Sequence, residues 1–333
     1  MGVTHTLMWK RFQSLLLASV ILSGVDYVAG MAECIIAGDI LGGQAVAAIT
    51  LLSPTMPLLT FIGMLIVSGS MTLFFFAQGQ ADKDEADNIY NQAMILCVIT
   101  GVILSVIMFA GKGAILSYWD VSADVANYAA EYYDGLAWRP AIYFVSQILL
   151  SLLLAEGELK RSVFAAVVQF TVTVAGAYFL CREYGAIGLS LGTTFGFVAD
   201  CFAKGSFLLT EKCPISLSFY LNAKKIVDVV RTSFGMALAD LWLAIFPFAM
   251  TSYLLGTFGE NTLIVFGVIN SILCVAFAVF QGIEQAMQPM VCVYHSEENL
   301  RGLDKIMNVS FGATVGIGVL LTAVFLSLSD TLP

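Results

Sequence analysis

The sequence predicts an all-α polytopic membrane protein with about nine transmembrane helices. Of its 333 residues, 59% are hydrophobic and only 12% are charged, and the mean hydropathy is +0.88. Soluble domains carry roughly twice that share of charged residues. Long stretches also lack any charged side chain, for example between Asp39 and Asp82 and between Glu260 and Glu284. Because a helix needs about 20 mostly apolar residues to cross a bilayer, these stretches are long enough to span one.

The uncharged windows place the expected helices in order along the chain. We expect spans at residues 12–37, 44–77, 90–110, 131–155, 162–181, 184–208, 226–255, 260–290 and 306–328. The second window contains Pro54 and Pro57, so that helix should start irregularly or kink, because proline removes a helix hydrogen bond. The first window is long enough for a retained spanning helix rather than a cleaved signal peptide.

The distribution of basic residues predicts the orientation. With a cytoplasmic N-terminus, twelve of the fifteen Lys and Arg residues fall in cytoplasmic segments, and only Lys112, Arg139 and Arg182 fall outside. This agrees with the excess of basic residues that cytoplasmic loops carry. After nine spans, the C-terminus would lie outside.

A weak internal repeat becomes visible when the sequence is shifted by 217 residues. Residues 86–106 then lie over residues 303–323, and Gly42 falls on Gly259. Six expected spans separate the two copies, so both copies have the same orientation. This is a parallel repeat, whose halves are related by an axis along the membrane normal.

The repeat divides the chain into two predicted parts. Residues 1–215 form an N-terminal six-helix bundle, and residues 216–333 form the first three helices of a second bundle. The last three helices of a complete second copy are absent from this sequence.

Composition and motifs argue against several classes of function. The net charge is −9 and no block of Lys or Arg occurs, so we expect no nucleic-acid partner. The seven cysteines have no metal-binding spacing and the two histidines lie near opposite ends, so we expect no metal site and no cofactor. Motifs of membrane-embedded or hydrolytic enzymes are missing, and the acidic run at 81–87 falls in an expected loop. We therefore expect that the protein is not an enzyme.

Four stretches, taken in order, resemble one known family. AECIIAGDILGGQAVAAI (32–49) is similar to its first-helix pattern, and LLLAEGELKRS (152–162) to one of its loops. YGAIGLSLGT (184–193) resembles the opening of its sixth helix, and FQGIEQAMQPMVCVYHSEEN (280–299) resembles a further segment. The family is the multidrug and toxic compound extrusion (MATE) transporters, and the likeness is greatest to its prokaryotic DinF/NorM-like branches.

The resemblance implies a fold and a function. The family fold has two six-helix bundles around a cavity that opens alternately to each side of the membrane. Its activity is efflux of amphipathic, often cationic, organic compounds in exchange for protons or sodium ions. The partners would then be small organic cations and the lipid bilayer, and the location would be a prokaryotic plasma (inner) membrane. The exported compound and the oligomeric state stay open.

Two other interpretations also stay open. One is a lipid-linked oligosaccharide flippase of the same superfamily, whose cavity would be rich in Arg and Lys. Here Arg139 is the only basic residue expected deep in the first bundle, which argues against a flippase. The other is a truncated, non-functional fragment, because the resemblance covers the first bundle and half of the second.

Two acidic residues within the first expected helix are the main candidates for ion coupling. Asp26 and Glu33 are seven residues apart and therefore share one helix face. A charge inside a membrane is costly, so such residues commonly face water, a partner or a proton. The resemblance places Glu33 on the first-helix acid implied in cation coupling, with Asp26 as its neighbour. The alternative is a structural acid that pairs with Arg139 or accepts hydrogen bonds from hydroxyl groups.

Other charged residues within the expected helices are further candidates. Asp240 is a lone acid in the seventh expected span and a candidate second cation site. Arg139 lies toward the outer side of the fourth expected span. It could line the cavity, or it could pair with Glu131, Asp134 or Glu33.

Uncharged side chains could complete the substrate cavity. Gln147 and Gln169 could line it or join helices, and Gln169 and Thr173 stand where the family's fifth helix usually carries Asn and Asp. Asp200 and Lys204 should form an ordinary i,i+4 ion pair near the cytoplasmic end of the sixth span. The remaining candidates could be cavity walls for flat cations or plain packing: Tyr27, Phe144 and Met250.

Overall fold

The computed structural model describes the backbone of residues 2–211, 213–216, 218–296 and 298–328. Within these ranges the chain is helical and contains no strand, as the sequence predicts. The elements are α1 (Gly2–Ile40), α2 (Gly43–Leu51), α3 (Thr55–Gly79), α4 (Lys83–Ser117), α5 (Ala123–Leu136), α6 (Arg139–Ala155), α7 (Leu159–Tyr184), α8 (Ala186–Gly205), the 3₁₀ turn η1 (Ser206–Leu209), α9 (Ala223–Phe258), α10 (Asn261–Ser296) and α11 (Leu300–Leu328).

Two of the predicted spans are broken helices. The predicted span at 44–77 is divided into α2 and α3, and Pro54 immediately precedes α3, as its prolines predict. The predicted span at 131–155 is divided into α5 and α6, which meet at 47°. Pro140 lies in the first turn of α6, where a missing backbone N–H costs nothing. Because of this break, Arg139 begins a helix instead of lying within one.

By length and composition, the described helices provide fewer candidate spans than the nine predicted. Among the described residues, seven helices are long and apolar enough to cross a membrane, or eight if α5 and α6 together form one span. In α10, where 260–290 was predicted to span, the described apolar stretch is Asn261–Asn270, which is too short to be counted as a span. The count of nine therefore stays a prediction.

The predicted repeat has a counterpart in the backbone. Ala81 and Glu298 are the only described non-glycine residues with positive φ, at 58° and 55°, and they are 217 positions apart. Gly42 and Gly259 are also 217 apart, with φ of 91° and 83°. Ala81 lies two residues before α4, and Glu298 lies two residues before α11. The two helices therefore also begin 217 positions apart. The same turn therefore joins the same helices in both copies.

Close contacts between glycines and neighbouring backbones hold the first bundle together. The α7–α8 pair is the most extensive, and a Cβ on Gly192 would lie 2.2 Å from the backbone nitrogen of Ala177. A Cβ on Gly196 would lie 1.9 Å from Thr173 Oγ1. Small residues allow such close approach between membrane helices. This contact fixes α8, which carries several residues of the site, against α7.

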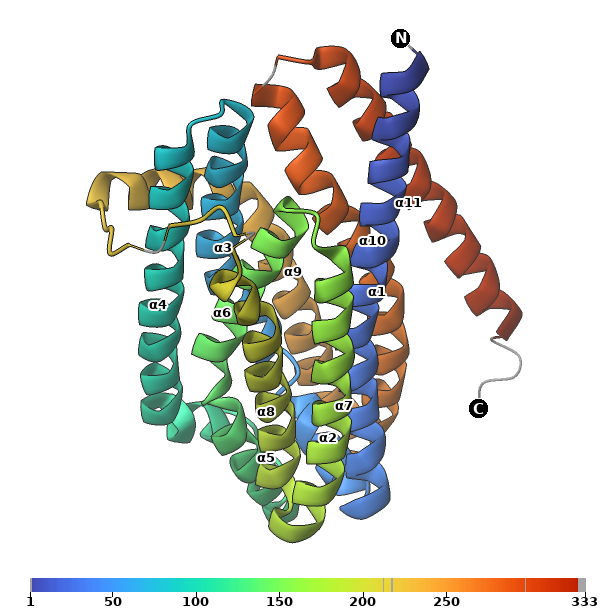
Figure 1. The fold of residues 1–333 in the computed structure, drawn as a ribbon. Helices are drawn as coiled ribbons and strands as arrows, with labels where there is room; N and C mark the ends of the chain where they lie inside the picture. The colour runs from blue at the N-terminus through green and yellow to red at the C-terminus, as the bar shows by residue number, and fades with distance from the viewer. Residues whose placement is uncertain (1, 212, 217, 297, 329–333) are drawn as a thin grey trace.

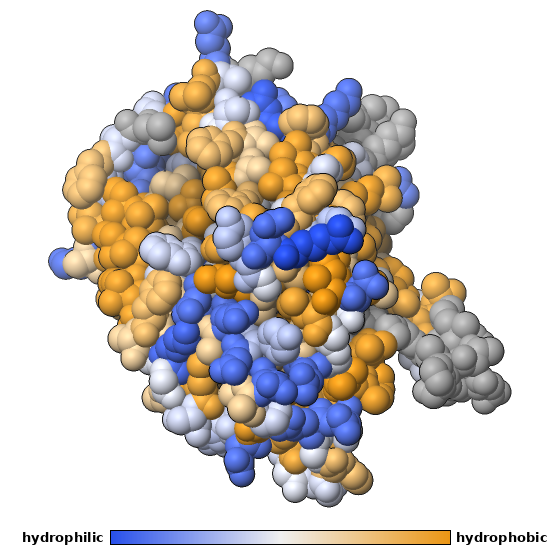
Figure 2. Space-filling view, turned by 90° about the horizontal axis from the view of Figure 1, so that it is seen from below, coloured by the Kyte–Doolittle hydropathy of each residue, from blue (hydrophilic) through white to orange (hydrophobic). Residues whose placement is uncertain are grey.

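The later helices pack onto the first bundle through α1 and α3. Helix α10 lies along α1 and also touches α2 and α3, while α9 lies along α3 (Figure 1). Helix α11 leaves this assembly and runs obliquely beside α10 (Figure 1). Large apolar side chains are exposed on α4 and α11, among them Val106 at 62% and Phe311 at 73%, as expected for faces in contact with lipid. Figure 2, which looks onto one end of the helices, shows hydrophilic side chains across that end and hydrophobic ones on much of the flanks.

Candidate functional site

Glu33 lies in the interior of the first bundle. Its side chain is 5% exposed on α1, and its polar neighbours are the hydroxyl groups of Tyr132 and Thr193 and the guanidinium of Arg139. These residues come from α5, α8 and α6, so four helices meet at this carboxyl group. Glu33 Oε1 is buried and has no hydrogen-bond partner among the described residues. The carboxyl group therefore has one oxygen available for a proton or a cation.

Arg139 is held beside Glu33 by α8. Its Nη2 donates to the carbonyl oxygen and to Oγ of Ser190, both at 3.2 Å, and the side chain is buried. Two of its predicted partners are engaged elsewhere. Asp134 pairs with Lys112 at 2.7 Å, and Glu131 accepts the backbone N–H of Ala186 at 3.3 Å. The interpretation that Arg139 pairs with Glu131 or Asp134 is therefore wrong, and Glu33 is the acid on which its charge acts.

Asp26 lies two helical turns from Glu33 on the same face of α1, and it is half-buried. Gln169 Nε2 on α7 donates to Asp26 Oδ1 at 2.6 Å. The charges of Lys204 and Asp200 on α8 also act on Asp26. Gln169 therefore joins α7 to α1 by binding an acid. Joining helices was one of the two roles predicted for it, the other being to line the cavity.

Asp200 and Lys204 form the predicted i,i+4 ion pair near the end of α8, but the pair is buried. Lys204 Nζ is 2.5 Å from Asp200 Oδ2, and the two side chains are 4% and 0% exposed. Ser146 Oγ on α6 accepts from Lys204 and donates to Asp200. The sequence contains a signal for this burial. Gly188, Gly192 and Gly196 are spaced four residues apart, and Asp200 and Lys204 follow at the same spacing, so all five lie along one face of α8. That buried stripe of α8 was not used in the sequence interpretation.

Asp240 on α9 lies across from Asp26. Tyr143 on α6 has both acids and Tyr27 as electrostatic neighbours, and it lies within hydrogen-bond reach of Gln147. Glu284 on α10 is close enough to Asp240 for the two charges to interact. The structure thus brings Asp26, Tyr27, Asp240 and Gln147, all sequence candidates, into one neighbourhood between the first bundle and the later helices.

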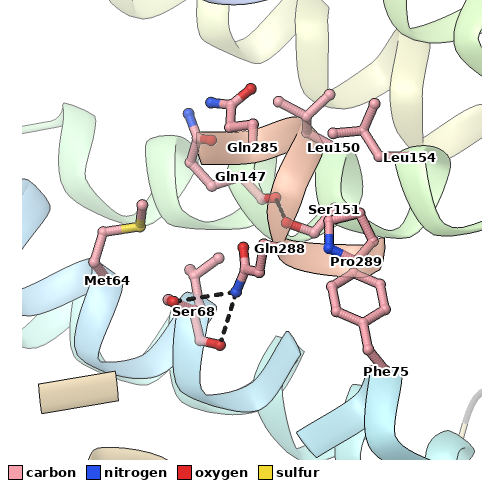
Figure 3. A pocket seen from close by; sticks show the side chains of 11 residues that line it. Met64, Ser68, Phe75, Gln147, Leu150, Ser151, Leu154, Gln285, Gln288 and Pro289 are labelled. Carbon is pink, nitrogen blue, oxygen red and sulfur yellow. Dashed lines mark hydrogen bonds between the residues drawn. The ribbon is translucent and has the colours of Figure 1, made fainter. Parts of the chain in front are cut away.

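A small pocket opens beside this neighbourhood, between α3, α6 and α10. Figure 3 shows Gln147, Gln285 and Gln288 in the same part of it. Gln288 Nε2 donates to the carbonyl oxygen and Oγ of Ser68 at 3.3 and 3.2 Å. Gln285 Oε1 is buried without a hydrogen-bond partner among the described residues. Sequence reasoning singled out Gln147 but not Gln285 or Gln288, because the pocket forms only where α3, α6 and α10 meet.

Of the residues predicted for the cavity, Gln147 alone lines this pocket. Arg139, Gln169 and Tyr27 lie near the buried acids instead, and Phe144 and Met250 lie elsewhere. Phe144 is 1% exposed and belongs to the apolar core, where its ring fills the space that the missing side chain of Gly63 leaves. Met250 is half-buried on α9, ten residues beyond Asp240 and therefore about 15 Å farther along the helix. Neither residue lines the pocket of Figure 3.

Taken together, fold and site define a polytopic helical protein with acids on the inward face of its first helix and a polar pocket between α3, α6 and α10. Residues 20–179 match the MatE family model, so this part of the chain is a MatE domain and the resemblance to MATE transporters is confirmed.

A curated protein is similar to this chain over most of its length. The chain is 23% identical over 275 residues to the probable multidrug resistance protein YoeA of Bacillus subtilis (strain 168), an alignment that covers 79% of the chain and 59% of YoeA. It therefore spans less than two thirds of that relative's length.

Solved structures confirm the fold. The structure of the MATE multidrug transporter DinF-BH, solved in complex with a ligand, superposes with a TM-score of 0.87 at 18% identity, covering 96% of this chain and 75% of DinF-BH. A MOP superfamily transporter from Pyrococcus furiosus Vc1 (DSM3638), described as having a binding pocket of reverse polarity that suggests a different function, gives a TM-score of 0.85 at 19% identity. That alignment covers 97% of this chain and 72% of the other.

Proposed function

We propose that the protein is a secondary antiporter that exports amphipathic, cationic organic compounds in exchange for protons, with sodium as the alternative coupling ion. The observation that carries this proposal is the buried carboxyl group of Glu33, which has an oxygen without a partner inside a MatE domain. The chain would act in a prokaryotic plasma membrane with its N-terminus in the cytoplasm, because that orientation places most basic residues inside.

The coupling follows from the cost of a buried carboxylate whose neighbouring cation, Arg139, is itself bound by Ser190. An ionised carboxylate away from water is unfavourable unless it binds a proton or lies beside a cation. A proton and a cation therefore compete for Glu33. If each is bound best in a different conformation, binding one favours release of the other on the opposite side. Arg139 and the hydroxyl groups of Tyr132 and Thr193 would hold the carboxyl group in place during this exchange.

The charges around the pocket favour cations over anions. Asp26 and Asp240 act on Tyr143, and Glu284 acts on Asp240. Arg139, in contrast, is bound by Ser190. An aromatic ring beside acids attracts a flat organic cation. The same arrangement argues against a flippase for lipid-linked diphosphates, which would need free basic groups.

Transport in liposomes tests the proposal. Vesicles that contain the protein are loaded with ethidium, a flat fluorescent organic cation, and an inwardly directed proton gradient is applied. We expect proton-driven efflux from the wild type and its loss in Glu33→Gln. Glu183→Gln, which changes an exposed acid at the end of α7, serves as the matched control and should transport normally.

Two outcomes would contradict the proposal. Efflux by Glu33→Gln at the wild-type rate would remove Glu33 from coupling. The absence of proton-driven efflux from correctly folded wild type would show that this chain does not act as an antiporter by itself. Efflux that follows a sodium gradient instead would select the alternative coupling ion.

A further inference from the structure

The pocket between α3, α6 and α10 is polar but uncharged. Among the described residues that line it, none has a charged side chain. Its polar members are Ser68 on α3, Gln147 and Ser151 on α6, and Gln285 and Gln288 on α10 (Figure 3). A molecule in this pocket is therefore held by hydrogen bonds and apolar contacts rather than by an ion pair.

Several hydrogen-bond donors of the lining are used within the protein. Gln288 Nε2 donates to the carbonyl oxygen and to Oγ of Ser68, at 3.3 and 3.2 Å. Ser68 Oγ donates in turn to Met236 Sδ at 3.1 Å. Ser151 Oγ donates to the carbonyl oxygen of Gln147 at 2.9 Å. These donors are therefore already committed to partners in the protein.

Two acceptors of Gln285, in contrast, lack their usual partners. Its side-chain Oε1 is buried and has no hydrogen-bond partner among the described residues. Its backbone carbonyl oxygen has no helical partner, because Pro289 lies four residues later inside α10 and proline has no N–H. In Figure 3 the side-chain oxygen of Gln288 also points away from Ser68. A buried acceptor without a donor is unfavourable, and a donor from a bound molecule removes that cost.

The pocket and Glu33 lie toward opposite ends of the helices. Leu154, in the pocket, is one residue from the end of α6, and Phe75 is four residues from the end of α3. Both helices end on the cytoplasmic side in the orientation proposed above. Glu33 is seven residues from the end of α1, which is on the outer side in that orientation. A compound that enters from the cytoplasm therefore meets this pocket before it reaches Glu33.

We propose that this pocket binds an amino group of the exported cation, and that Gln285 is the acceptor that selects it. The ligands it favours are flat organic cations with primary or secondary amino groups, because their N–H groups can donate to the two oxygens of Gln285. Cations whose nitrogens are fully alkylated cannot do so. Phe75 and Leu150 supply apolar contacts for the ring that carries the amino group. That the ligand is an organic cation rests on the proposed function.

Proflavine and acridine orange form a matched pair of probes for this pocket. Both are flat, fluorescent acridine cations, but the outer amino groups bear hydrogen in proflavine and methyl groups in acridine orange. The full chain is reconstituted in lipid nanodiscs, and the dissociation constant of each dye is measured by fluorescence titration against empty nanodiscs. Comparison of the two constants gives the preference of the pocket for N–H donors.

Removal of the Gln285 side-chain acceptor should reduce that preference. Methionine has the length of glutamine but no amide oxygen, so Gln285→Met should weaken proflavine binding about tenfold and change acridine orange binding little. Gln80→Met makes the same change at an exposed position after α3, so it is the matched control and should keep the wild-type preference. If Gln285→Met does not fold, Pro289→Ala decides, because its new N–H occupies the Gln285 carbonyl oxygen and should also lower the preference.

The outcomes separate this proposal from the antiport proposal. An equal preference in wild type and Gln285→Met would overturn the role of Gln285, and so would a wild type that binds neither dye. A reduced preference in Gln285→Met, without proton-driven efflux by the wild type, would support the pocket and refute antiport alone. Ethidium efflux that depends on Glu33, together with an unchanged preference in Gln285→Met, would refute the pocket alone.

Discussion

The amide of Gln169 on α7 donates a hydrogen bond of 2.6 Å to the Asp26 carboxyl group on α1. The charges of Asp200 and Lys204 on α8 act on this acid, and the acid in turn acts on Tyr143 of α6. In the MATE resemblance, Gln169 stands where an asparagine is usual on the fifth helix. An amide at this position therefore binds an acid of the first helix directly.

Replacement of Gln169 should weaken both folding and transport. In Gln169→Leu the Asp26 carboxyl group loses its donor, and a hydrogen bond to a charged group contributes about 1.5–3 kcal/mol. We expect the unfolding temperature to fall and ethidium efflux to slow. Thermal unfolding and the liposome assay measure the two effects. Gln169→Asn, which keeps an amide, should have the smaller effect, and equal effects of the two variants would contradict this role.

Close packing of α7 and α8 predicts strong sensitivity at Gly192. A Cβ there would lie 2.2 Å from the backbone nitrogen of Ala177, so Gly192→Ala must separate the helices. Overpacking of this kind costs about 1–3 kcal/mol. The matched control is Gly113→Ala on α4, where a Cβ meets no atom within 4 Å. Because alanine favours helix, Gly113→Ala should leave stability unchanged or raise it by about 0.5–1 kcal/mol. Thermal unfolding of both variants tests the contrast.

The ion pair between Lys225 of α9 and Glu85 of α4 predicts a pH dependence. Its atoms are 2.6 Å apart, both side chains are partly exposed, and both residues lie in the first turn of their helices. Partial burial opposes the charge of Lys225, but the hydrogen bonds with Glu85 and Tyr220 outweigh it and raise the pKa of Lys225. A raised lysine pKa stabilises the fold fully below the unfolded pKa, and this stabilisation is lost as pH rises through the folded pKa.

Wild-type stability should therefore fall at alkaline pH more steeply than that of Lys225→Met. Because both side chains are partly exposed, the difference should stay below about 1 kcal/mol. Denaturation at a series of pH values above neutrality measures it. Parallel curves for the two proteins would show that the pair contributes no pH-dependent stability.

Phe144 and Gln147 lie one turn apart on α6 and should have opposite roles. Phe144 is packed in the core, so Phe144→Ala should cost about 3–5 kcal/mol and leave ethidium affinity unchanged in protein that remains folded. Gln147 lines the pocket of Figure 3, so Gln147→Ala should weaken ethidium binding with little loss of stability. Equilibrium binding and thermal unfolding of both variants separate the roles. Reversed results would place the substrate pocket beside Phe144 instead of Gln147.

Local sequence patterns predicted the helices well, because hydropathy and proline act within one segment. Pro54 and Pro57 indicated the break between α2 and α3. Pro140 indicated the start of α6 but was not interpreted, so the break before Arg139 was missed. The repeat of 217 residues also agrees with the backbone, because Ala81 and Glu298 adopt the same positive-φ turn although they are different residue types.

The site was predicted only in part, because it depends on which helix faces meet. The shared face of Asp26 and Glu33 follows from helix geometry alone. The contact of Asp26 with Gln169 joins residues far apart in the sequence, and so does the contact of Arg139 with Ser190. The sequence left Glu131, Asp134 and Glu33 open as partners of Arg139, and in the structure Lys112 binds Asp134.

The central claim is that a proton and an organic cation compete for Glu33, and proton release on cation binding measures this most directly. Ethidium is added to purified protein in weakly buffered solution, and a pH indicator counts the protons released for each cation bound. The account predicts that the wild type and Glu183→Gln release one proton more per bound cation than Glu33→Gln does. Equal release by wild type and Glu33→Gln, with ethidium bound by both, would contradict it.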